Sequence, residues 1–231
     1  MRRYIFLPKS YKQSDLQCER AVCITPQEVA DIIKNSRAVL ITGGVLLENP
    51  KLAEYAAKIA QHIPVIATGA SSKVLLNQGV KPLTCVFTLQ HVTHYFIDGE
   101  WEIAKKFDTA IFLGFKPYYV SRFLSALKHF SNMTTLSLDE FYQPNAHYSM
   151  TAFVMVIDED RCTGCGDCVA VCRTMAKGVL RVVDGRLAVR PDRCIACSAC
   201  MTACGMNAIK MERGERLHHV LLDEIIRLLE R

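Results

Sequence analysis

The sequence predicts an α/β protein of two domains, in which a parallel β-sheet covered by helices precedes a smaller, cysteine-rich α+β domain. The chain has 231 residues, which is long for one small domain. Segments with strand-like and helix-like patterns alternate between about Ser36 and Met150, and eight of the eleven cysteines lie between Cys162 and Cys204. We expect a sheet domain over residues 1–151, a cysteine-rich domain over 152–212 and a C-terminal amphipathic helix over 213–231.

The alternating segments predict that the sheet is parallel and has helices on both faces. Strands are expected at residues 37–42, 64–68, 109–113 and 133–138, and helices at 49–59 and 117–130. In the first of these helices, Leu52, Tyr55 and Ile59 recur at helical spacing, and Pro50 suits a first helical turn. Strands that alternate with helices are typical of parallel sheets, because a parallel pair needs a long crossover connection.

Small residues follow three of the expected strands at their carboxyl ends, where an open parallel sheet binds its ligand. Glycine at such a point allows the backbone to approach a phosphate or a ring closely. The candidate cofactor-binding residues are Gly43, Gly44, Thr68, Gly69, Ala70, Ser71 and Gly114. The chain has neither a G-x-G-x-x-G fingerprint nor a P-loop, and glycine is also ordinary in loops. These residues therefore leave open whether the sheet edge binds a dinucleotide or no cofactor.

Two cysteine runs share the spacing C-x2-C-x2-C-x3-C. In a two-cluster arrangement, three closely spaced thiolates surround one 4Fe-4S cluster, and the fourth, at the start of a helix, binds the other cluster. We therefore predict one cluster on Cys162, Cys165, Cys168 and Cys204, and a second cluster on Cys194, Cys197, Cys200 and Cys172. This region resembles the bacterial-type two-cluster ferredoxins over about 60 residues.

The segments around the two runs agree with this resemblance. Residues 153–157 alternate as a strand should, and residues 178–190 are typical of a hairpin that turns at Asp184-Gly185. Arg173 and Gly205 stand where proline usually follows the fourth cysteine, which changes local rigidity but removes no ligand. Zinc is the alternative, although zinc sites need only four ligands and rarely use three cysteines at two-residue intervals.

Composition limits the classes of function. Half of the residues are hydrophobic and 22% are charged, as in soluble globular proteins. The net charge of +5 comes from dispersed basic residues, so the sequence predicts no nucleic-acid binding. No segment has the roughly 18 consecutive apolar residues of a membrane span. Arg2-Arg3 lacks the apolar stretch of an export signal after it, and we expect a cytoplasmic protein.

The expected ferredoxin-like domain is nearly neutral, with eight Lys and Arg against seven Asp and Glu between Phe153 and Glu212. Freely diffusing ferredoxins are usually strongly acidic and find their partners through that field. A neutral ferredoxin that is fused to another domain indicates a docked electron relay.

Four segments of the N-terminal domain carry a more specific resemblance. Residues 40–47, 63–69, 112–130 and 142–149 are similar to the epsilon subunit family of the archaeal carbon monoxide dehydrogenase/acetyl-CoA synthase (acetyl-CoA decarbonylase/synthase) complex. The similarity covers about 120 to 150 residues. It implies a Rossmann-like domain of the nucleotide- and flavin-binding type, with FAD as a candidate cofactor. The implied partner is the nickel-iron carbon monoxide dehydrogenase catalytic (alpha) subunit. The C-terminal ferredoxin-like extension departs from the family pattern.

These observations predict a non-catalytic electron-transfer subunit of such a complex. Electrons would pass from the catalytic subunit through the two clusters to a flavin or to an external acceptor, either a deazaflavin-reducing flavoprotein or a ferredoxin. One alternative is that the N-terminal domain is a structural or assembly subunit without cofactor that carries a tethered ferredoxin. Another is a free-standing flavin- or nicotinamide-dependent oxidoreductase, which the missing fingerprint and the missing acid/base set disfavour.

The remaining signals are weaker. Leu217, Val220, Leu221, Ile225, Leu228 and Leu229 are expected on one face of the C-terminal helix, packed on its own domain or, alternatively, on a partner. Cys18, Cys23 and Cys85 belong to neither cysteine run and are expected to be reduced thiols.

Overall fold

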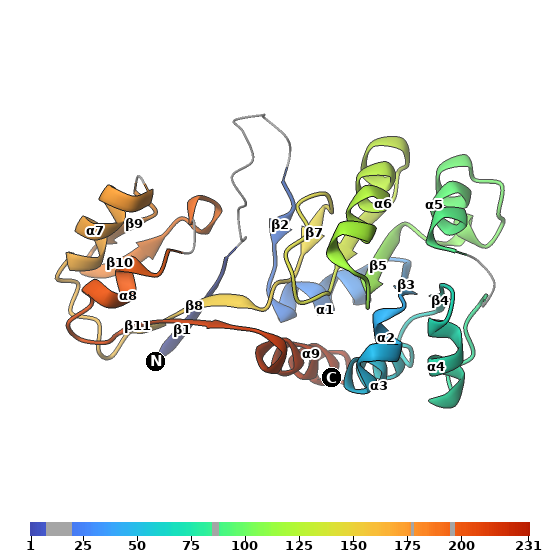
Figure 1. Ribbon diagram of the computed structural model, residues 1–231, viewed down its shortest axis with the longest axis horizontal. Helices are drawn as coiled ribbons and strands as arrows, with labels where there is room; N and C mark the ends of the chain where they lie inside the picture. Colours follow the sequence, from blue (N-terminus) through green and yellow to red (C-terminus); the bar gives the residue numbers. More distant parts are fainter. Residues whose placement is uncertain (8–19, 85–87, 177, 195–196) are drawn as a thin grey trace. The chain divides into compact units, whose positions relative to one another are not determined.

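The computed structural model describes residues 1–7, 20–84, 88–176, 178–194 and 197–231 (Figure 1). Contacts within the chain divide it into two compact units, each built from two separate stretches. The cluster unit joins Met1–Cys18 to Thr151–His218, and the sheet unit joins Glu19–Met150 to His219–Arg231. Cys18 and Cys85 lie outside the described residues.

The sheet unit contains a six-stranded sheet in which all neighbouring strands are parallel, which confirms the predicted α/β class. The strands lie in the order β2-β7-β6-β5-β3-β4. Their bounds are β2 Val22–Cys23, β3 Ala38–Thr42, β4 Val65–Ala67, β5 Thr109–Leu113, β6 Thr134–Ser137 and β7 Tyr148–Ser149. Every residue of β3, β4 and β5 is buried, as expected for strands covered on both faces.

Helices cover the sheet on both sides. The helices of this unit are α1 Pro26–Asn35, α2 Val45–Glu48, α3 Pro50–Ile59, α4 Ser71–Asn77, α5 Leu89–Asp98 and α6 Pro117–Phe130, with a 3-10 turn η1 at Ala104–Lys106. Figure 1 shows α5 and α6 on one side of the sheet and α3 on the other. Buried side chains such as Val92, Leu124 and Leu127 pack α5 and α6 against the apolar residues of β3 and β5. The family's flavin-binding type of this fold stays a prediction.

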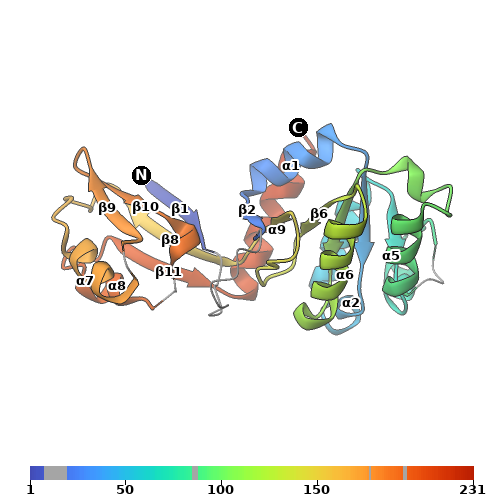
Figure 2. The ribbon, with the colours of Figure 1, turned by 90° about the horizontal axis from the view of Figure 1, so that it is seen from above.

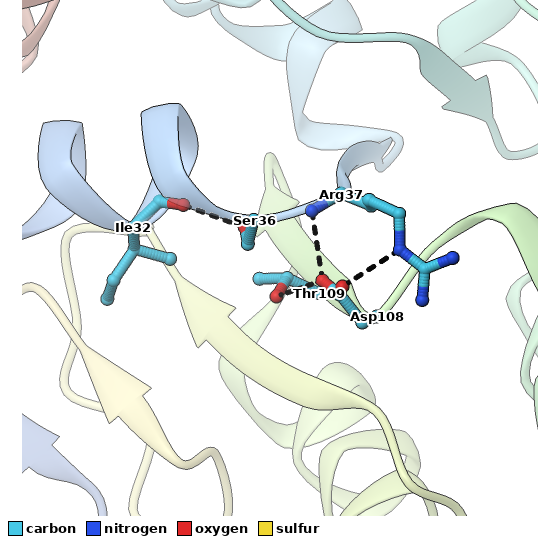
Figure 3. A network of polar contacts seen from close by, with 5 residues as sticks. All are labelled: Ile32, Ser36, Arg37, Asp108 and Thr109. Carbon is cyan, nitrogen blue, oxygen red and sulfur yellow. Dashed lines mark hydrogen bonds and ion pairs between the residues drawn. The ribbon is translucent and has the colours of Figure 1, made fainter.

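The amino ends of β3 and β5 are joined by a polar network (Figure 3). The Arg37 backbone amide and its Nε each donate to the Asp108 carboxylate at 3.0 Å, and Thr109 Oγ1 donates to the same carboxylate. Burial favours the neutral acid, but these hydrogen bonds outweigh it and hold the pKa of Asp108 below its ordinary value. The network fixes how the two central strands begin, at the edge opposite to the candidate cofactor residues.

The cluster unit is a small α+β fold. Its antiparallel sheet has the order β1-β8-β11, and a separate hairpin pairs β9 with β10. In chain order, the bounds are β1 Arg2–Phe6, β8 Phe153–Asp158, α7 Asp167–Ala176, β9 Leu180–Val183, β10 Arg186–Val189, η2 Pro191–Arg193, α8 Ala199–Ala203 and β11 Ile209–Arg213. Helices α7 and α8 contact each other and lie side by side in Figure 2. The hairpin and the strand expected before the first cysteine run are both present.

The N-terminal strand belongs to the cluster unit, and the expectation that residues 1–151 form one domain is wrong at this end. β1 pairs with β8 along its whole length, from Arg2 opposite Asp158 to Phe6 opposite Val154. Leu7, which follows β1, is fully buried in the core around the cysteines. The partner of β1 lies about 150 residues away in the sequence, and no local pattern reveals such a pairing.

The C-terminal helix α9, Glu215–Leu229, crosses from one unit to the other. From His219 onward it belongs to the sheet unit, where Tyr55 Oη donates to Asp223 Oδ2 at 3.0 Å and Lys34 Nζ donates to the Leu228 carbonyl at 2.7 Å. Its buried face consists of His218, Leu221, Leu222, Ile225, Ile226 and Leu229. The predicted face was therefore wrong at Val220, which is 50% exposed, and it missed Leu222 and Ile226. No helix in the described part of the chain has the length and apolar run that a bilayer crossing requires.

Candidate metal centres

The loop of the first cysteine run adopts backbone conformations that favour glycine. Gly164 and Gly166 have φ angles of +69° and +89°. A Cβ on Gly164 would lie 2.5 Å from the carbonyl oxygen of Gly185, so only glycine allows the loop to pack on the turn of the β9–β10 hairpin. The loop ends where α7 begins, and α7 carries Cys168 and Cys172 on successive turns.

The first predicted cluster site is assembled from both cysteine runs. One cavity is lined by Cys162, Cys165 and Cys168 together with Cys204, which follows α8. The pKa of the Cys168 thiol is raised to about 11, mainly by burial. The neighbouring Cys204, Cys162 and Cys165 contribute to the same rise. The structure therefore brings the fourth cysteine of the second run to the first three of the first run.

The second predicted site shows the reciprocal exchange. Burial raises the pKa of Cys200 to about 11, with further contributions from Cys194, Cys197 and Cys172. Cys172 comes from α7 of the first run, while the other three cysteines belong to the second run. Cys168 of the first site also contributes to the pKa of Cys200, which shows that the two sites are neighbours.

The residues around both sites fit iron–sulfur clusters. Four thiolates held together in apolar surroundings repel one another, and an iron–sulfur core offers a positive centre for that charge. The backbone amide of Ala208 donates to Cys204 Sγ at 3.3 Å, and Leu7, Leu180 and Leu187 lie buried in the same core as the cysteines. Hydrogen bonds to sulfur and limited solvent access are the means by which a protein sets a cluster's reduction potential.

A cubane cluster and a single zinc ion require different spacings of the four sulfur atoms. Among the described residues, no three His, Cys, Asp or Glu side chains are placed to hold one metal ion. Around zinc, every sulfur lies about 2.3 Å from one metal atom. In a cubane each thiolate binds a different iron, so the four sulfur atoms stand farther apart.

The candidate cofactor residues of the sheet unit have two different roles. Gly44, Thr68, Gly69 and Ala70 line a crevice of about 380 Å³ at the carboxyl ends of the strands, together with residues of the β5–α6 loop and α6. Gly43 and Gly114 instead pack on each other, since a Cβ on Gly43 would lie 2.4 Å from the Gly114 carbonyl oxygen. Ser71 is buried, and its hydroxyl donates to the carbonyls of Thr42 and Thr68.

Asp139 is a residue of this edge that the sequence analysis missed. It is buried just after β6 and accepts hydrogen bonds from the amides of Gly114 at 2.6 Å and of Phe115 at 3.3 Å. Burial raises the pKa of Asp139 to about 7, although these hydrogen bonds oppose the shift. An acidic residue directly after a buried strand was the only available signal. Asp139 fixes the loop that borders the crevice.

We predict that replacing Asp139 with Asn changes how stability depends on pH. In the folded chain Asp139 keeps its proton up to about pH 7, whereas in the unfolded chain it ionises near its ordinary value of 3.8. Between these values the folded state binds more protons, so the stability of the unaltered protein falls as pH rises. Between about pH 5.5 and 8, the free energy of unfolding of the unaltered protein is expected to fall by about 2 kcal/mol relative to that of D139N. Denaturant unfolding of the sheet unit in both proteins, followed by Trp101 fluorescence at the two pH values, measures this change. A difference in the free energy of unfolding that stays the same at both pH values would contradict the prediction.

Comparison with known proteins finds one protein family for most of the N-terminal part of the chain and another for the cysteine-rich part. Residues 6–158 match the family model for the CO dehydrogenase beta subunit/acetyl-CoA synthase epsilon subunit, and residues 154–205 match that of a 4Fe-4S dicluster domain. The fold and the cysteines thus define a protein that combines a parallel α/β sheet with a ferredoxin-like dicluster domain. The chain belongs to the CO dehydrogenase beta subunit/acetyl-CoA synthase epsilon subunit family.

Curated relatives include epsilon subunits of acetyl-CoA decarbonylase/synthase complexes. The epsilon 1 subunit of Archaeoglobus fulgidus is 46% identical over 149 residues, which cover 62% of this chain and 81% of the relative. The epsilon 1 subunit of Methanosarcina barkeri is 30% identical over 132 residues, covering 54% and 76%. The epsilon subunit of Methanothermobacter thermautotrophicus is 29% identical over 137 residues, covering 57% and 78%.

Proposed function

We propose that this chain is an electron-transfer subunit of an acetyl-CoA decarbonylase/synthase complex, in which electrons move one at a time through two 4Fe-4S clusters. The observation that carries the proposal is the pair of neighbouring four-cysteine sites, each completed by a cysteine from the other run. Bound clusters would supply one-electron chemistry at low potential. The protein's part is to hold them close together, shield them and limit their exposure to water.

The family supports a specific set of partners for this relay. The curated relatives are subunits of acetyl-CoA decarbonylase/synthase complexes by name. On this basis the electron donor is the nickel-iron carbon monoxide dehydrogenase catalytic (alpha) subunit. The acceptor is a flavin, a deazaflavin-reducing flavoprotein or an external ferredoxin.

Anaerobic purification of the complex from its source tests this proposal. We expect about eight irons and eight sulfides per chain, together with a co-purifying nickel-iron dehydrogenase. Carbon monoxide should bleach the cluster absorption of this chain within the complex. Clusters that carbon monoxide fails to reduce in the intact complex would refute the relay, and a chain that purifies without iron would refute the cluster assignment itself.

The crevice at the sheet edge favours FAD as an additional cofactor. The chain runs from β3 to β4 on one side and then returns to β5 on the other side of β3, so the strand order reverses there. Open α/β sheets bind ligands outside the carboxyl ends of the strands at this kind of point. A volume of about 380 Å³ lies within the usual range for small-molecule sites.

A purified protein that releases flavin on mild denaturation would support this assignment. Gly44 lines the crevice and has open space where a Cβ would stand, so Gly44→Phe fills the crevice without a backbone clash. We expect this variant to fold and to lose flavin. If the unaltered protein contains no flavin and still assembles with the dehydrogenase, the alternative of a cofactor-free assembly domain with a tethered ferredoxin is correct.

A further inference from the structure

Another cavity of the sheet unit lies at the amino ends of its central strands, at the edge opposite to the candidate cofactor residues. Its volume of about 480 Å³ lies within the usual range for small-molecule sites. The ends of α5 and α6, the turn η1 and the residues before β5 and β6 contribute to its lining. It shares no described lining residue with the crevice or with the cavity of the first cluster site.

Aromatic side chains form much of the wall of this amino-edge cavity. Phe96 and Met133 are buried, and the partly buried Phe107 packs against the same core. Phe130 also lines the cavity, and yet it is 72% exposed, so it stands at the rim. Aromatic rings pack on other rings in offset-stacked and edge-to-face arrangements. The wall therefore suits a ligand with a flat, apolar body.

Arg37 supplies a positioned polar group beside this wall. Its Nε donates to Asp108 Oδ2 at 3.0 Å, and its backbone amide donates to Oδ1 of the same carboxylate. No hydrogen bond found within the described ranges involves Nη1 or Nη2, and in Figure 3 these atoms contact none of the residues drawn. A guanidinium whose two terminal nitrogens are open can bind a carboxylate in a bidentate way.

The groups around Arg37 leave room for an additional negative charge. Among the described residues that line the amino-edge cavity, Asp108 is the one acid. Both of its oxygens are already occupied, since Oδ1 accepts from the Arg37 amide and from Thr109, and Oδ2 accepts from Arg37 Nε. Lys105 also lines the cavity, and it pairs with Glu102. The charge of Asp108 is thus compensated within the protein and does not require a cation.

A neighbouring cavity of about 470 Å³ shares Arg37 and Phe107 with the amino-edge cavity. Lys34 and His62 line it, and no acidic side chain of the described chain does. The carboxyl ends of α5 and α6, which carry partial negative charge, also border the amino-edge cavity. A cation is therefore the alternative to an anion, and direct contact with the guanidinium favours the anion.

We propose that the amino-edge cavity is a binding site for an aromatic carboxylate. The carboxylate binds Nη1 and Nη2 of Arg37, and the ring system packs between Phe107 and Phe130. Asp108 is a positioning residue, because it holds the guanidinium that contacts the ligand. Binding is reversible, and no bond is made or broken. The site is independent of the electron relay and of the proposed flavin, since it lies at the other edge of the sheet.

Binding of naphthoate to the intact protein tests the proposal. Calorimetry should show saturable binding with a dissociation constant below about 1 mM. Naphthamide has the same ring system without the charge, and naphthylmethylammonium carries the opposite charge. Both should bind about tenfold more weakly or worse. In protein with isotope-labelled methionine methyl groups, naphthoate should shift the signal of Met133, which lines the cavity, and leave those of the other methionines in place.

Two variants separate the charge of Arg37 from its shape. Arg37→Lys keeps the charge without the fork, and Arg37→Gln removes both. The dissociation constant of naphthoate is expected to rise about threefold or more in R37K and about tenfold or more in R37Q, while that of naphthamide hardly changes. Arg122→Gln is the matched control, because Arg122 is an exposed arginine of α6 outside the cavity.

Four outcomes would overturn the proposal. Naphthoate would show no saturable binding, naphthamide or naphthylmethylammonium would bind as tightly as naphthoate, the methyl shift would fall on other methionines, or R122Q would lose as much affinity as R37Q. The first three are measured on the unaltered protein, so they do not depend on whether a variant folds.

Discussion

Replacing Cys165 and Cys204 together is expected to leave one intact 4Fe-4S cluster, whereas replacing Cys165 and Cys172 together is expected to leave none. In the crossed arrangement, Cys165 and Cys204 belong to the same site, so C165A/C204A spares all four ligands of the other site. Cys172 belongs to the second site, so C165A/C172A removes one ligand from each. The two double variants remove the same number of thiolates and differ only in how these are distributed.

Iron and sulfide analysis and electron paramagnetic resonance of the reduced proteins distinguish the outcomes. C165A/C204A should retain about four irons per chain and the spectrum of a single all-cysteine cluster, without the coupling between two reduced clusters. C165A/C172A should give three-iron species or no cluster, because neither site keeps four thiolates. The reverse result, with an intact cluster only in C165A/C172A, would show that each run binds its own cluster.

Leu7→Ala is expected to destabilise the cluster unit by about 2–5 kcal/mol and to leave the sheet unit unchanged. Leu7 is fully buried in the core around the cysteines, and its amide donates to the Phe153 carbonyl at 2.9 Å. Truncation removes apolar contacts and leaves a cavity beside the cluster sites. The effect therefore falls on residues about 150 positions away in the sequence.

Two signals separate the units. The only tryptophan of the chain, Trp101, packs on the sheet unit's core, and the iron–sulfur absorption reports on the cluster unit. In L7A the loss of cluster absorption on heating or in chelator should occur earlier, while the Trp101 transition stays in place. Leu124→Ala is the matched control, since Leu124 is fully buried in α6 and should shift the Trp101 transition. A shift of the Trp101 transition in L7A would show that Leu7 stabilises the sheet unit and would contradict the prediction.

The parts of the fold that could be predicted are those with a local signal. Strands β3 and β5 are short, fully buried and mostly apolar, and each is followed by glycine. The hairpin turns at Asp184-Gly185, where both residues have positive φ angles. The crossed assignment of the cysteines to two clusters also follows from the spacing of each run, and it stays a prediction, although the structure places the same cysteines near one another. In these places local conformation and tertiary structure agree.

The parts that could not be predicted depend on contacts between distant segments. β2 and β7 have two residues each, too few for a strand pattern, and they form only because parallel neighbours complete the sheet. Gly43 and Gly114 were expected to approach a cofactor, which stays a prediction, and no local pattern revealed that a Cβ on Gly43 would meet Gly114 or that a Cβ on Gly114 would meet Leu46. For α9, helical spacing predicted an apolar face that includes Val220. The face that is actually buried includes Leu222 and Ile226 instead, because packing against distant segments decides which side of the helix is covered.

The interleaving of the two units has a consequence for biosynthesis. β1 leaves the ribosome about 150 residues before its partner β8, which corresponds to a delay of roughly 8–30 s at 5–20 residues per second. The sheet unit's strands are all translated during that interval, and its closing helix α9 follows only after the last cysteine. Iron–sulfur insertion can therefore be completed only once nearly the whole polypeptide has been made. For the same reason, no single proteolytic cleavage separates the two units, because each is built from two stretches of the chain.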